Sequence, residues 1–394
     1  MGNLQQMKDL LEMNIPPQIW VDASNRNQLF FNQEFVQQTK EFTFNGREIK
    51  NIYLVSFLTN LTELNLFDNK ISDISAISKL KNLKTLCLGS NRIEGISKLQ
   101  SLPDLTYLYL QFNKLTSYTL ALPNLTKLSL SENKLQDISG LQHSPKQLEI
   151  LDLSNTETTD LRTIPHQLFG LKDLKLYKNI IIEIAHLSNF VDLQFLRLDK
   201  NKQLKNIGPL KFCTQLTELR ISETNVSDIW SLQFMKYLKI LYMDETQVID
   251  LHPLQHLYQL EIISAYDACI IDVSPLSKLT QLQDLKFKNN KITNADRLKH
   301  HQNFSEYNLF YQKGYNFSDQ KNPTTDELKF YNKILSVHSS HKQIRKLIQA
   351  ENRASKFKEQ MTHRKEQIQL KINEQIHMNK KIEIIFSQNS YADQ

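Results

Sequence analysis

Three cysteines and a histidine pair are the residues of this chain that could support chemistry on their own. Cys87, Cys213 and Cys269 lie far apart and form no C-x-x-C pair. They therefore predict free thiols in a reducing compartment rather than a disulfide framework. His300-His301 could begin a metal site, but no Cys or further ligand stands at a suitable spacing. The preferred interpretation is a solvated histidine pair, and no metal or cofactor is expected.

Motifs that signal catalysis are missing from the sequence. It contains no phosphate-binding G-x-x-x-x-G-K-[ST], no dinucleotide-binding G-x-G-x-x-G, no H-E-x-x-H zinc motif and no G-x-S-x-G nucleophile turn. We therefore expect no enzymatic activity and assign no catalytic residue. The functional question becomes one of recognition.

The elements that would position any functional residue come from one repeated frame of 22 residues. The frame is L-x-x-L-x-L-x-x-N-x-I-x-x-I-x-x-L-x-x-L-x-x, and a period of this length predicts a solenoid. Its eleven copies begin at Leu61, Leu83, Leu105, Leu125, Leu148, Leu171, Leu193, Leu216, Leu238, Leu260 and Leu282. A twelfth, degenerate copy precedes them, with Thr39 in the first leucine slot and Arg47 in the Asn slot.

Each slot of the frame has a structural interpretation. The L-x-L alternation predicts a short strand with leucines inward, and strands of successive repeats pair in parallel. The Asn that follows can satisfy backbone groups left unpaired where the chain turns. Thr156, Thr224 and Thr246 replace it in part, whereas Ala268 cannot and predicts a weak rung. Six aspartates on the outer side predict capped 3₁₀ turns. They are Asp73, Asp137, Asp160, Asp228, Asp250 and Asp272.

The frame, as it stands in Leu61–Leu80 and Leu125–Leu141, resembles the 22-residue subfamily of leucine-rich repeats. That subfamily includes a nuclear regulatory subunit of type-1 protein phosphatase, bacterial internalins and several axonemal proteins. The resemblance covers about residues 39–303. It implies an α/β solenoid: a right-handed arc with a parallel concave sheet and a convex side of 3₁₀ turns and loops. It also implies that protein partners bind on the concave face.

The chain of 394 residues divides into four predicted segments. Residues 1–38 are expected to form an N-terminal helical cap, and residues 39–303 the leucine-rich-repeat domain of about 12 repeats. Residues 304–323 would form a C-terminal cap or linker, and residues 324–394 a basic, coiled-coil-like helical tail. Residues 1–304 hold 33 Lys and Arg against 32 Asp and Glu, whereas residues 305–394 hold 15 against 10. The net charge of +6 is therefore concentrated in the tail.

Partner specificity is expected at the third, fifth, seventh and eighth positions of each repeat, which face outward from the concave sheet. Exposed aromatic residues are frequent hot spots of protein interfaces. The predicted protein-binding residues are Phe67, Tyr107, Tyr109, Phe112, Lys175, Tyr177, Phe195, Arg197, Arg220, Tyr242 and Tyr266. An alternative is that charged pairs such as Arg197 with Glu218 are cross-strand ladders that serve the sheet itself.

These observations predict a non-enzymatic scaffold or adaptor that binds a protein on its concave face. One alternative is a regulatory subunit of a type-1-like protein phosphatase. Another is an RNA-processing or axonemal adaptor that uses the basic tail. The tail helix is expected to bind a second partner or to self-associate; nucleic acid and membrane are not expected partners. With no targeting signal visible, the predicted location is cytoplasmic, and nuclear or cytoskeletal association stays open.

Overall fold

One parallel sheet organises the chain. The structure, a computed structural model, describes residues 20–23, 28–31, 33–298 and 301. Twelve strands follow one another in sequence order from β3 to β14, each paired in parallel with its neighbours. Their bounds are β3 Glu41–Thr43, β4 Glu63–Asn65, β5 Thr85–Cys87, β6 Tyr107–Tyr109, β7 Lys127–Ser129, β8 Ile150–Asp152, β9 Asp173–Lys175, β10 Phe195–Arg197, β11 Glu218–Arg220, β12 Ile240–Tyr242, β13 Ile262–Ser264 and β14 Asp284–Lys286.

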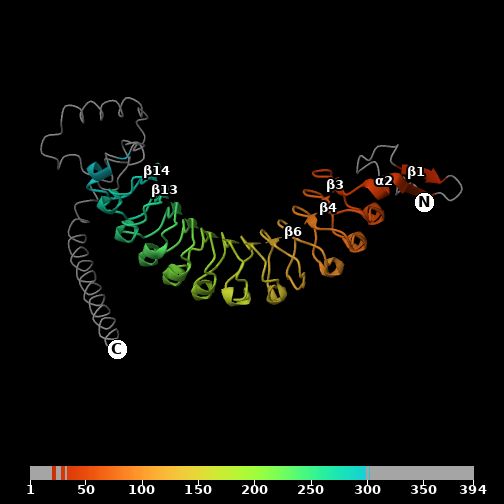
Figure 1. Cartoon of the computed structure of the whole chain (residues 1–394), viewed down its shortest axis with the longest axis horizontal. Coiled ribbons are helices and arrows are strands. Elements are labelled where there is room, and N and C mark those ends of the chain that lie inside the picture. The colour runs from red at the N-terminus through yellow and green to blue at the C-terminus, as the bar shows by residue number, and fades with distance from the viewer. Residues whose placement is uncertain (1–19, 24–27, 32, 299–300, 302–394) are drawn as a thin grey trace, which may run out of the picture. The chain divides into compact units, whose positions relative to one another are not determined.

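Short 3₁₀ turns lie on the side opposite the strands. In Figure 1 the repeats curve so that the strands line the concave side and the turns line the convex side. The turns are η2 Tyr53–Phe57, η3 Ser75–Lys79, η4 Ser97–Ser101, η5 Ser139–His143, η6 Leu161–Thr163, η7 Ala185–Asn189, η8 Gly208–Phe212, η9 Trp230–Phe234, η10 His252–Leu254, η11 Ser274–Leu276 and η12 Ala295–Leu298. The predicted solenoid with a parallel concave sheet and a 3₁₀ convex side is confirmed.

The core is the stack of inward leucines and isoleucines that the frame predicts. Leu64, Leu86 and Leu108 stand side by side in register across β4, β5 and β6, and none of the three is exposed to solvent. The residues on either side of them point outward, because side chains alternate along a strand. Each repeat thus contributes one layer to a continuous apolar core. The third repeat is shorter, and buried Tyr118 fills its convex side.

The Asn slot forms the ladder that the sequence predicts. Asn201 is fully buried. Its Oδ1 accepts a hydrogen bond from the Ile181 N–H (3.1 Å), and its Nδ2 donates to the Leu176 and Leu198 carbonyls at 2.9 and 2.8 Å. The ladder therefore ties each repeat to the one before it. A threonine supplies less: the Thr246 hydroxyl donates to a carbonyl of its own repeat, that of Met243.

The residue just before the Asn slot has a left-handed backbone. From Gly46 to Asn289, the eighth residue of every repeat has φ between 51° and 64°. Asn, Asp and Gly tolerate this conformation best, and a bulky side chain is disfavoured there. Phe112 nevertheless occupies it, with φ 55°. Because a left-handed residue with a Cβ costs roughly 1–2 kcal/mol, an aromatic ring is not what the fold alone would favour here.

The predicted N-terminal helical cap is only partly correct. Strands β1 (Trp20–Ala23) and β2 (Gln28–Phe31) form an antiparallel pair, and helix α2 covers Gln33–Gln38. The helix expected from residue 3 lies outside the described residues. Trp20, Val21 and Phe30 are aromatic or β-branched, and such side chains favour strands. Their clustering was a strand signal that the helical interpretation overlooked.

The C-terminal predictions fall mostly outside the described residues. This holds for the cap or linker at 304–323 and for the basic tail at 324–394. His301 is buried, so the predicted solvated histidine pair is wrong for this residue, whose backbone N–H donates to the Leu298 carbonyl after the last turn. In the part of the chain that the structure describes, no helix has the length and apolarity needed to span a membrane.

The predicted aspartate caps are confirmed. Each of the six carboxylates accepts a hydrogen bond from the backbone N–H two residues later, at 2.7–2.9 Å. For Asp137, the hydrogen bond from the Ser139 backbone lowers the carboxyl pKa. For Asp160, hydrogen bonds from the Arg162 side chain and backbone lower it. Each cap holds the entrance of a convex turn in place.

These lowered pKa values predict a pH dependence of stability. A carboxyl whose folded pKa lies below its unfolded value stabilises the fold when ionised, and loses that contribution as pH falls through the folded pKa. In a variant with Asp137→Asn and Asp160→Asn, the side chains still accept a hydrogen bond but do not titrate. The stability advantage of the wild type, measured by urea unfolding, should shrink between about pH 5 and about pH 2. An advantage that stays constant over this range would contradict the assignment.

Candidate protein-binding face

All eleven predicted binding residues lie on the concave side, between or just after the inward leucines of their strands. Tyr107 and Tyr109 flank Leu108 in β6, and Phe195 and Arg197 flank Leu196 in β10. Tyr107, Phe112 and Phe195 are exposed, and the other eight are half-buried. The predicted outward orientation of these positions is therefore correct, and the residues differ in what already covers them.

Four aromatic residues gather near the N-terminal end of the concave face, and we call them the aromatic patch: Phe67, Tyr107, Tyr109 and Phe112. Phe112 is 53% exposed and Tyr107 42%. Gly89, in the repeat between, leaves room for Phe67 and Gln111 to lie across it. A Cβ at position 89 would stand 3.0 Å from Phe67 Cδ2 and 2.7 Å from Gln111 Cδ. The absence of a side chain at Gly89 thus leaves a shallow, largely apolar surface across three repeats.

Gln111 adds an unsatisfied polar group to this surface. Its Oε1 is buried and accepts no hydrogen bond from any described residue. A buried acceptor without a partner costs roughly 1–3 kcal/mol, so proteins rarely leave one unless it has a use. Because this atom is not accessible from the surface, the Gln111 side chain would have to move before a partner could bond to it. In this structure the aromatic patch therefore offers apolar area rather than a polar contact.

Four tyrosines of the face, one of them in the aromatic patch, are paired with cations. In each case the cation comes from an adjacent repeat and lies over the ring, an arrangement worth about 0.5–1 kcal/mol at an exposed site. The pairs, with the cation-to-centroid distance, are Lys127 with Tyr109 (5.1 Å), Lys200 with Tyr177 (5.5 Å), Arg220 with Tyr242 (4.4 Å) and Lys288 with Tyr266 (5.9 Å). Among the aromatic patch residues, Tyr109 alone belongs to this set.

The predicted cationic residues of the central face have partners within the sheet. Glu218 is buried between two arginines: Arg220 Nε lies 2.5 Å and Arg197 Nη2 3.6 Å from its Oε1. Lys175 Nζ lies 3.5 Å from Asp173 Oδ2, where burial raises the pKa of the Asp173 carboxyl despite the nearby lysine. Only the Arg197–Glu218 contact joins neighbouring strands, as the alternative of a cross-strand ladder expects. The Arg220–Glu218 and Lys175–Asp173 pairs each lie within one strand, and they too compensate the charges of the cations.

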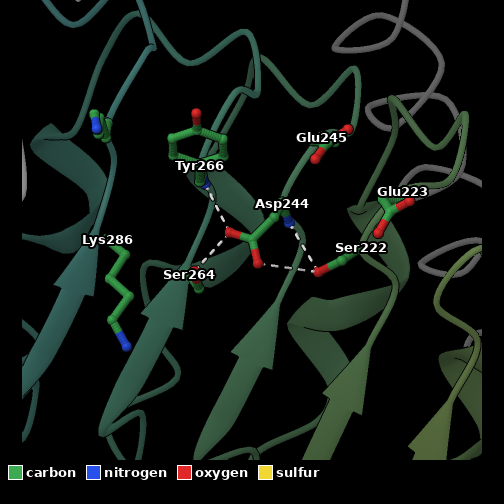
Figure 2. Close-up of a pocket in the computed structure, with 8 residues that line it drawn as sticks. Ser222, Glu223, Asp244, Glu245, Ser264, Tyr266 and Lys286 are labelled. Carbon is green, nitrogen blue, oxygen red and sulfur yellow. Dashed lines mark hydrogen bonds between the residues drawn. The ribbon is translucent and has the colours of Figure 1, made fainter. Parts of the chain in front are cut away.

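Further along the face lies an open hollow of about 450 Å³ that the repeat frame alone does not predict. Its lining residues are Ser222, Glu223, Asp244, Glu245, Ser264, Tyr266, Lys286 and Lys288. Figure 2 shows Glu223 and Glu245 on one side of it and Lys286 on the other. Lys286 Nζ lies 2.7 Å from Asp284 Oδ2, and this hydrogen bond raises the lysine pKa. The hollow therefore has an acidic side and a basic side.

Asp244 holds three successive repeats together at the centre of this hollow. Its carboxylate accepts hydrogen bonds from the Ser264 hydroxyl (2.5 Å), the Tyr266 backbone N–H (2.8 Å) and the Ser222 hydroxyl (3.2 Å), as Figure 2 shows. These bonds assign Asp244 to the fold rather than to a ligand. The seventh positions of consecutive repeats are Ser222, Asp244, Tyr266 and Lys288. Following that row along the sequence would have revealed most of the hollow.

Comparisons with known proteins agree with this geometry. The family model described as leucine rich repeats (2 copies) matches residues 59–100, 81–121 and 123–166. Residues 59–121 and 123–166 therefore carry leucine-rich repeats, and the solenoid of which they form part has the leucine-rich-repeat fold. Among curated proteins no sequence matches this chain.

Several solved structures share the leucine-rich-repeat fold with this chain. An internalin of Listeria monocytogenes is 24% identical with a TM-score of 0.64, over 77% of this chain and 93% of that one. A leucine-rich-repeat protein of Leptospira interrogans is 23% identical with a TM-score of 0.60, over 66% and 70%. The functional domain of InlJ from Listeria monocytogenes is 23% identical with a TM-score of 0.52, over 68% of each chain. At these identities the likeness concerns the fold.

The three cysteines of the chain are free, as predicted. Cys213 is buried in the core, where its thiol donates to the Leu187 carbonyl and burial raises its pKa to about 12. Cys87 is half-buried on the concave side, and burial also raises its pKa. A raised pKa keeps a thiol protonated and unreactive. Among the described residues, no group of three or more His, Cys, Asp or Glu side chains could hold a metal ion.

Proposed function

We propose that this protein is a non-enzymatic interaction scaffold that binds a protein partner through the aromatic patch on its concave face. The observation that supports this proposal best is the exposure of Phe112 at a backbone position that disfavours a bulky residue. The fold gains nothing from an aromatic ring there, so recognition is the better explanation for it. Leucine-rich-repeat proteins generally act as protein-interaction scaffolds.

The chemistry of the patch fits a protein better than a small molecule. It is a shallow surface spread over three repeats rather than a closed pocket, and large aromatic anchors dominate the binding energy of such surfaces.

Two partner classes are proposed. The more general one is any protein held by a scaffold in the cytoplasm, and the more specific one is the catalytic subunit of a type-1-like phosphatase, for which this protein would be a regulatory subunit. The specific proposal depends on the 22-residue frame alone. Affinity purification of the full chain followed by mass spectrometry distinguishes them. A catalytic phosphatase subunit that co-purifies through the aromatic patch would favour the regulator, and any other protein held through the patch would favour a different scaffold role.

We expect the triple variant Tyr107→Ala, Tyr109→Ala, Phe112→Ala to lose partner binding. Removal of one hot-spot side chain costs at least about 2 kcal/mol, or roughly 30-fold in the dissociation constant, and this variant removes three candidates. Its melting midpoint should stay close to that of the wild type, because the rings face away from the core. Binding is measured by titration calorimetry with the purified partner, and folding by circular dichroism.

A matched control for this variant is Tyr53→Ala, which removes an equally exposed tyrosine (54% exposed) from a convex turn. The control should bind as the wild type does. Full binding by the triple variant would rule out the aromatic patch as the contact surface. A collapsed melting midpoint would instead show that the rings pack inward and that the register is wrong.

A further inference from the structure

A second cluster of exposed aromatic residues lies on the opposite side of the solenoid, and we call it the convex patch: Phe212, Trp230, Phe234 and Tyr237. Their exposed fractions are 50%, 40%, 40% and 49%. Exposed aromatic side chains that stand alone need no explanation, whereas a contiguous group on a soluble protein marks an interaction surface. The proposed concave function makes no use of these residues.

The convex turns bring the rings of Trp230 and Phe234 together and place Phe212 on the adjoining turn, whereas Tyr237 follows three residues after η9. Phe212 is the last residue of η8 and Phe234 the last residue of the neighbouring turn η9, so both occupy the same slot of successive repeats. Trp230 begins η9, and its ring meets that of Phe234 edge to face with centroids 5.2 Å apart. In η3, η4, η5 and η7 the last slot holds a polar residue. Successive rings in this slot are therefore a local property of these two repeats.

The rings are not needed to fill the core. In η9 the inward positions are Leu232 and Met235, and both are fully buried. The outward rings add apolar area that water covers in the free protein. Burying the side chain of an exposed aromatic residue is worth roughly 1.5–3 kcal/mol, so four such rings can anchor a partner segment.

Two lysines give this surface a charge preference. Lys211 lies beside Phe212, with its Nζ 4.9 Å from the ring centroid, and Lys236 directly precedes Tyr237. In the described part of the chain, no carboxylate lies within 4.0 Å of either ammonium group. Asp228 is the carboxylate that lies nearest to this turn in the sequence, and it already accepts a hydrogen bond from the backbone N–H of Trp230 at the start of η9. The convex patch thus offers apolar rings with two uncompensated positive charges.

We propose that the convex patch binds an acidic amphipathic helix of a partner protein. Apolar side chains at helical spacing would cover the rings of Phe212, Trp230 and Phe234, and flanking Asp or Glu side chains would pair with the two lysines. The patch spans two neighbouring turns on the convex side, where the repeats are further apart than the ~4.8 Å of the paired strands, so about two turns of helix are needed to cover it. An anionic membrane is less well matched, because stable surface binding needs a larger basic cluster than two lysines.

Selection from a displayed library of 16-residue helical peptides tests this proposal with the full chain as bait. We expect the enriched peptides to carry apolar residues at i, i+3 and i+4 with Asp or Glu beside them. The variant Trp230→Ser, Phe234→Ser should bind a synthetic copy of an enriched peptide at least tenfold more weakly than the wild type does. Lys211→Glu with Lys236→Glu should weaken it as well and should reverse the charge preference when the selection is repeated with that variant. Tyr53→Ser, which removes a distant convex ring, should leave binding unchanged.

Several results would overturn the proposal. One is retention of the peptide by the Trp230→Ser, Phe234→Ser variant while circular dichroism shows both proteins folded. Another is enrichment of peptides without an acidic bias. Patch-dependent binding to vesicles that contain 30% phosphatidylserine, with no peptide selected, would assign the surface to membranes. A patch-dependent dimer in light scattering would assign it to a second copy of the chain. A cross-link from a photoreactive residue at position 234 to residues 302–394 would assign it to the chain's own tail.

Discussion

Replacement of Leu108 by alanine is expected to lower the free energy of unfolding by about 2–5 kcal/mol. Leu108 is the central inward residue of β6, and no part of it is exposed. It stands between Leu86 and Leu128 of the adjacent strands, in register with both. Truncation removes apolar contacts and leaves a cavity that the flanking layers cannot fill, because the backbone hydrogen bonds of both neighbouring strands hold the spacing fixed.

Urea unfolding followed by circular dichroism measures this loss, and the chain supplies a matched control one residue away. Tyr107→Ala removes a larger side chain from the same strand, but that side chain points to solvent. Its effect on stability should stay within about 0.5 kcal/mol, as for surface substitutions generally. Equal losses in the two variants would mean that β6 is placed one residue out of register, because such a slip exchanges the two faces of a strand.

The second large effect is expected from Asn201→Ala. The substitution removes the acceptor for the Ile181 N–H and the donor to the Leu176 and Leu198 carbonyls, all in the buried interior of the ladder. An unsatisfied buried backbone group costs roughly 1–3 kcal/mol, so we expect a total loss of about 2–5 kcal/mol. A loss below about 0.5 kcal/mol would show that water or neighbouring groups replace the amide.

Ala268→Asn is the reciprocal test. Ala268 occupies the Asn slot of its repeat and is buried. An asparagine there would restore the donor and acceptor that the other repeats have, so the free energy of unfolding should rise by about 0.5–1.5 kcal/mol, the net worth of a typical internal hydrogen bond. A destabilised variant would mean that the smaller side chain is required for packing at this repeat. Both changes are read from the same urea titrations as Leu108→Ala.

The sequence was sufficient for the solenoid because its information is local and repeated. The strand positions, the Asn ladder and the aspartate caps each depend on residues within one repeat or at the same slot of the next. Asp137 and Asp272, for example, cap their turns as predicted. The N-terminal segment failed for the opposite reason. Trp20–Phe31 lies outside the repeated frame, so no second copy of the pattern distinguishes the helical spacing around Leu4 from the strand-forming residues that follow it.

The candidate site was predictable in orientation but not in contacts. The frame shows that Tyr242 and Arg197 face outward. It does not show that Arg220 lies over the Tyr242 ring or that Glu218 is shared by two arginines, because such pairs depend on rotamers across neighbouring strands. The hollow around Asp244 could not be predicted for the same reason, because its shape depends on side-chain rotamers of neighbouring strands. The role of Gly89 could not be predicted either. Its lack of a side chain leaves space that Phe67 and Gln111 occupy, and this contact is visible only in the structure.

Pairing of each strand only with the strands of the preceding and following repeats has a consequence for how the protein opens. Separation of a terminal rung breaks one interface, whereas separation of a central rung such as β8 breaks two. Opening therefore begins at the ends and proceeds inward, and backbone amides near the middle exchange with solvent last. The aromatic patch covers the second to fourth strands from the N-terminal end of the sheet, where fraying is more frequent than at the centre. A partner bound across these repeats would close that end and slow its exchange.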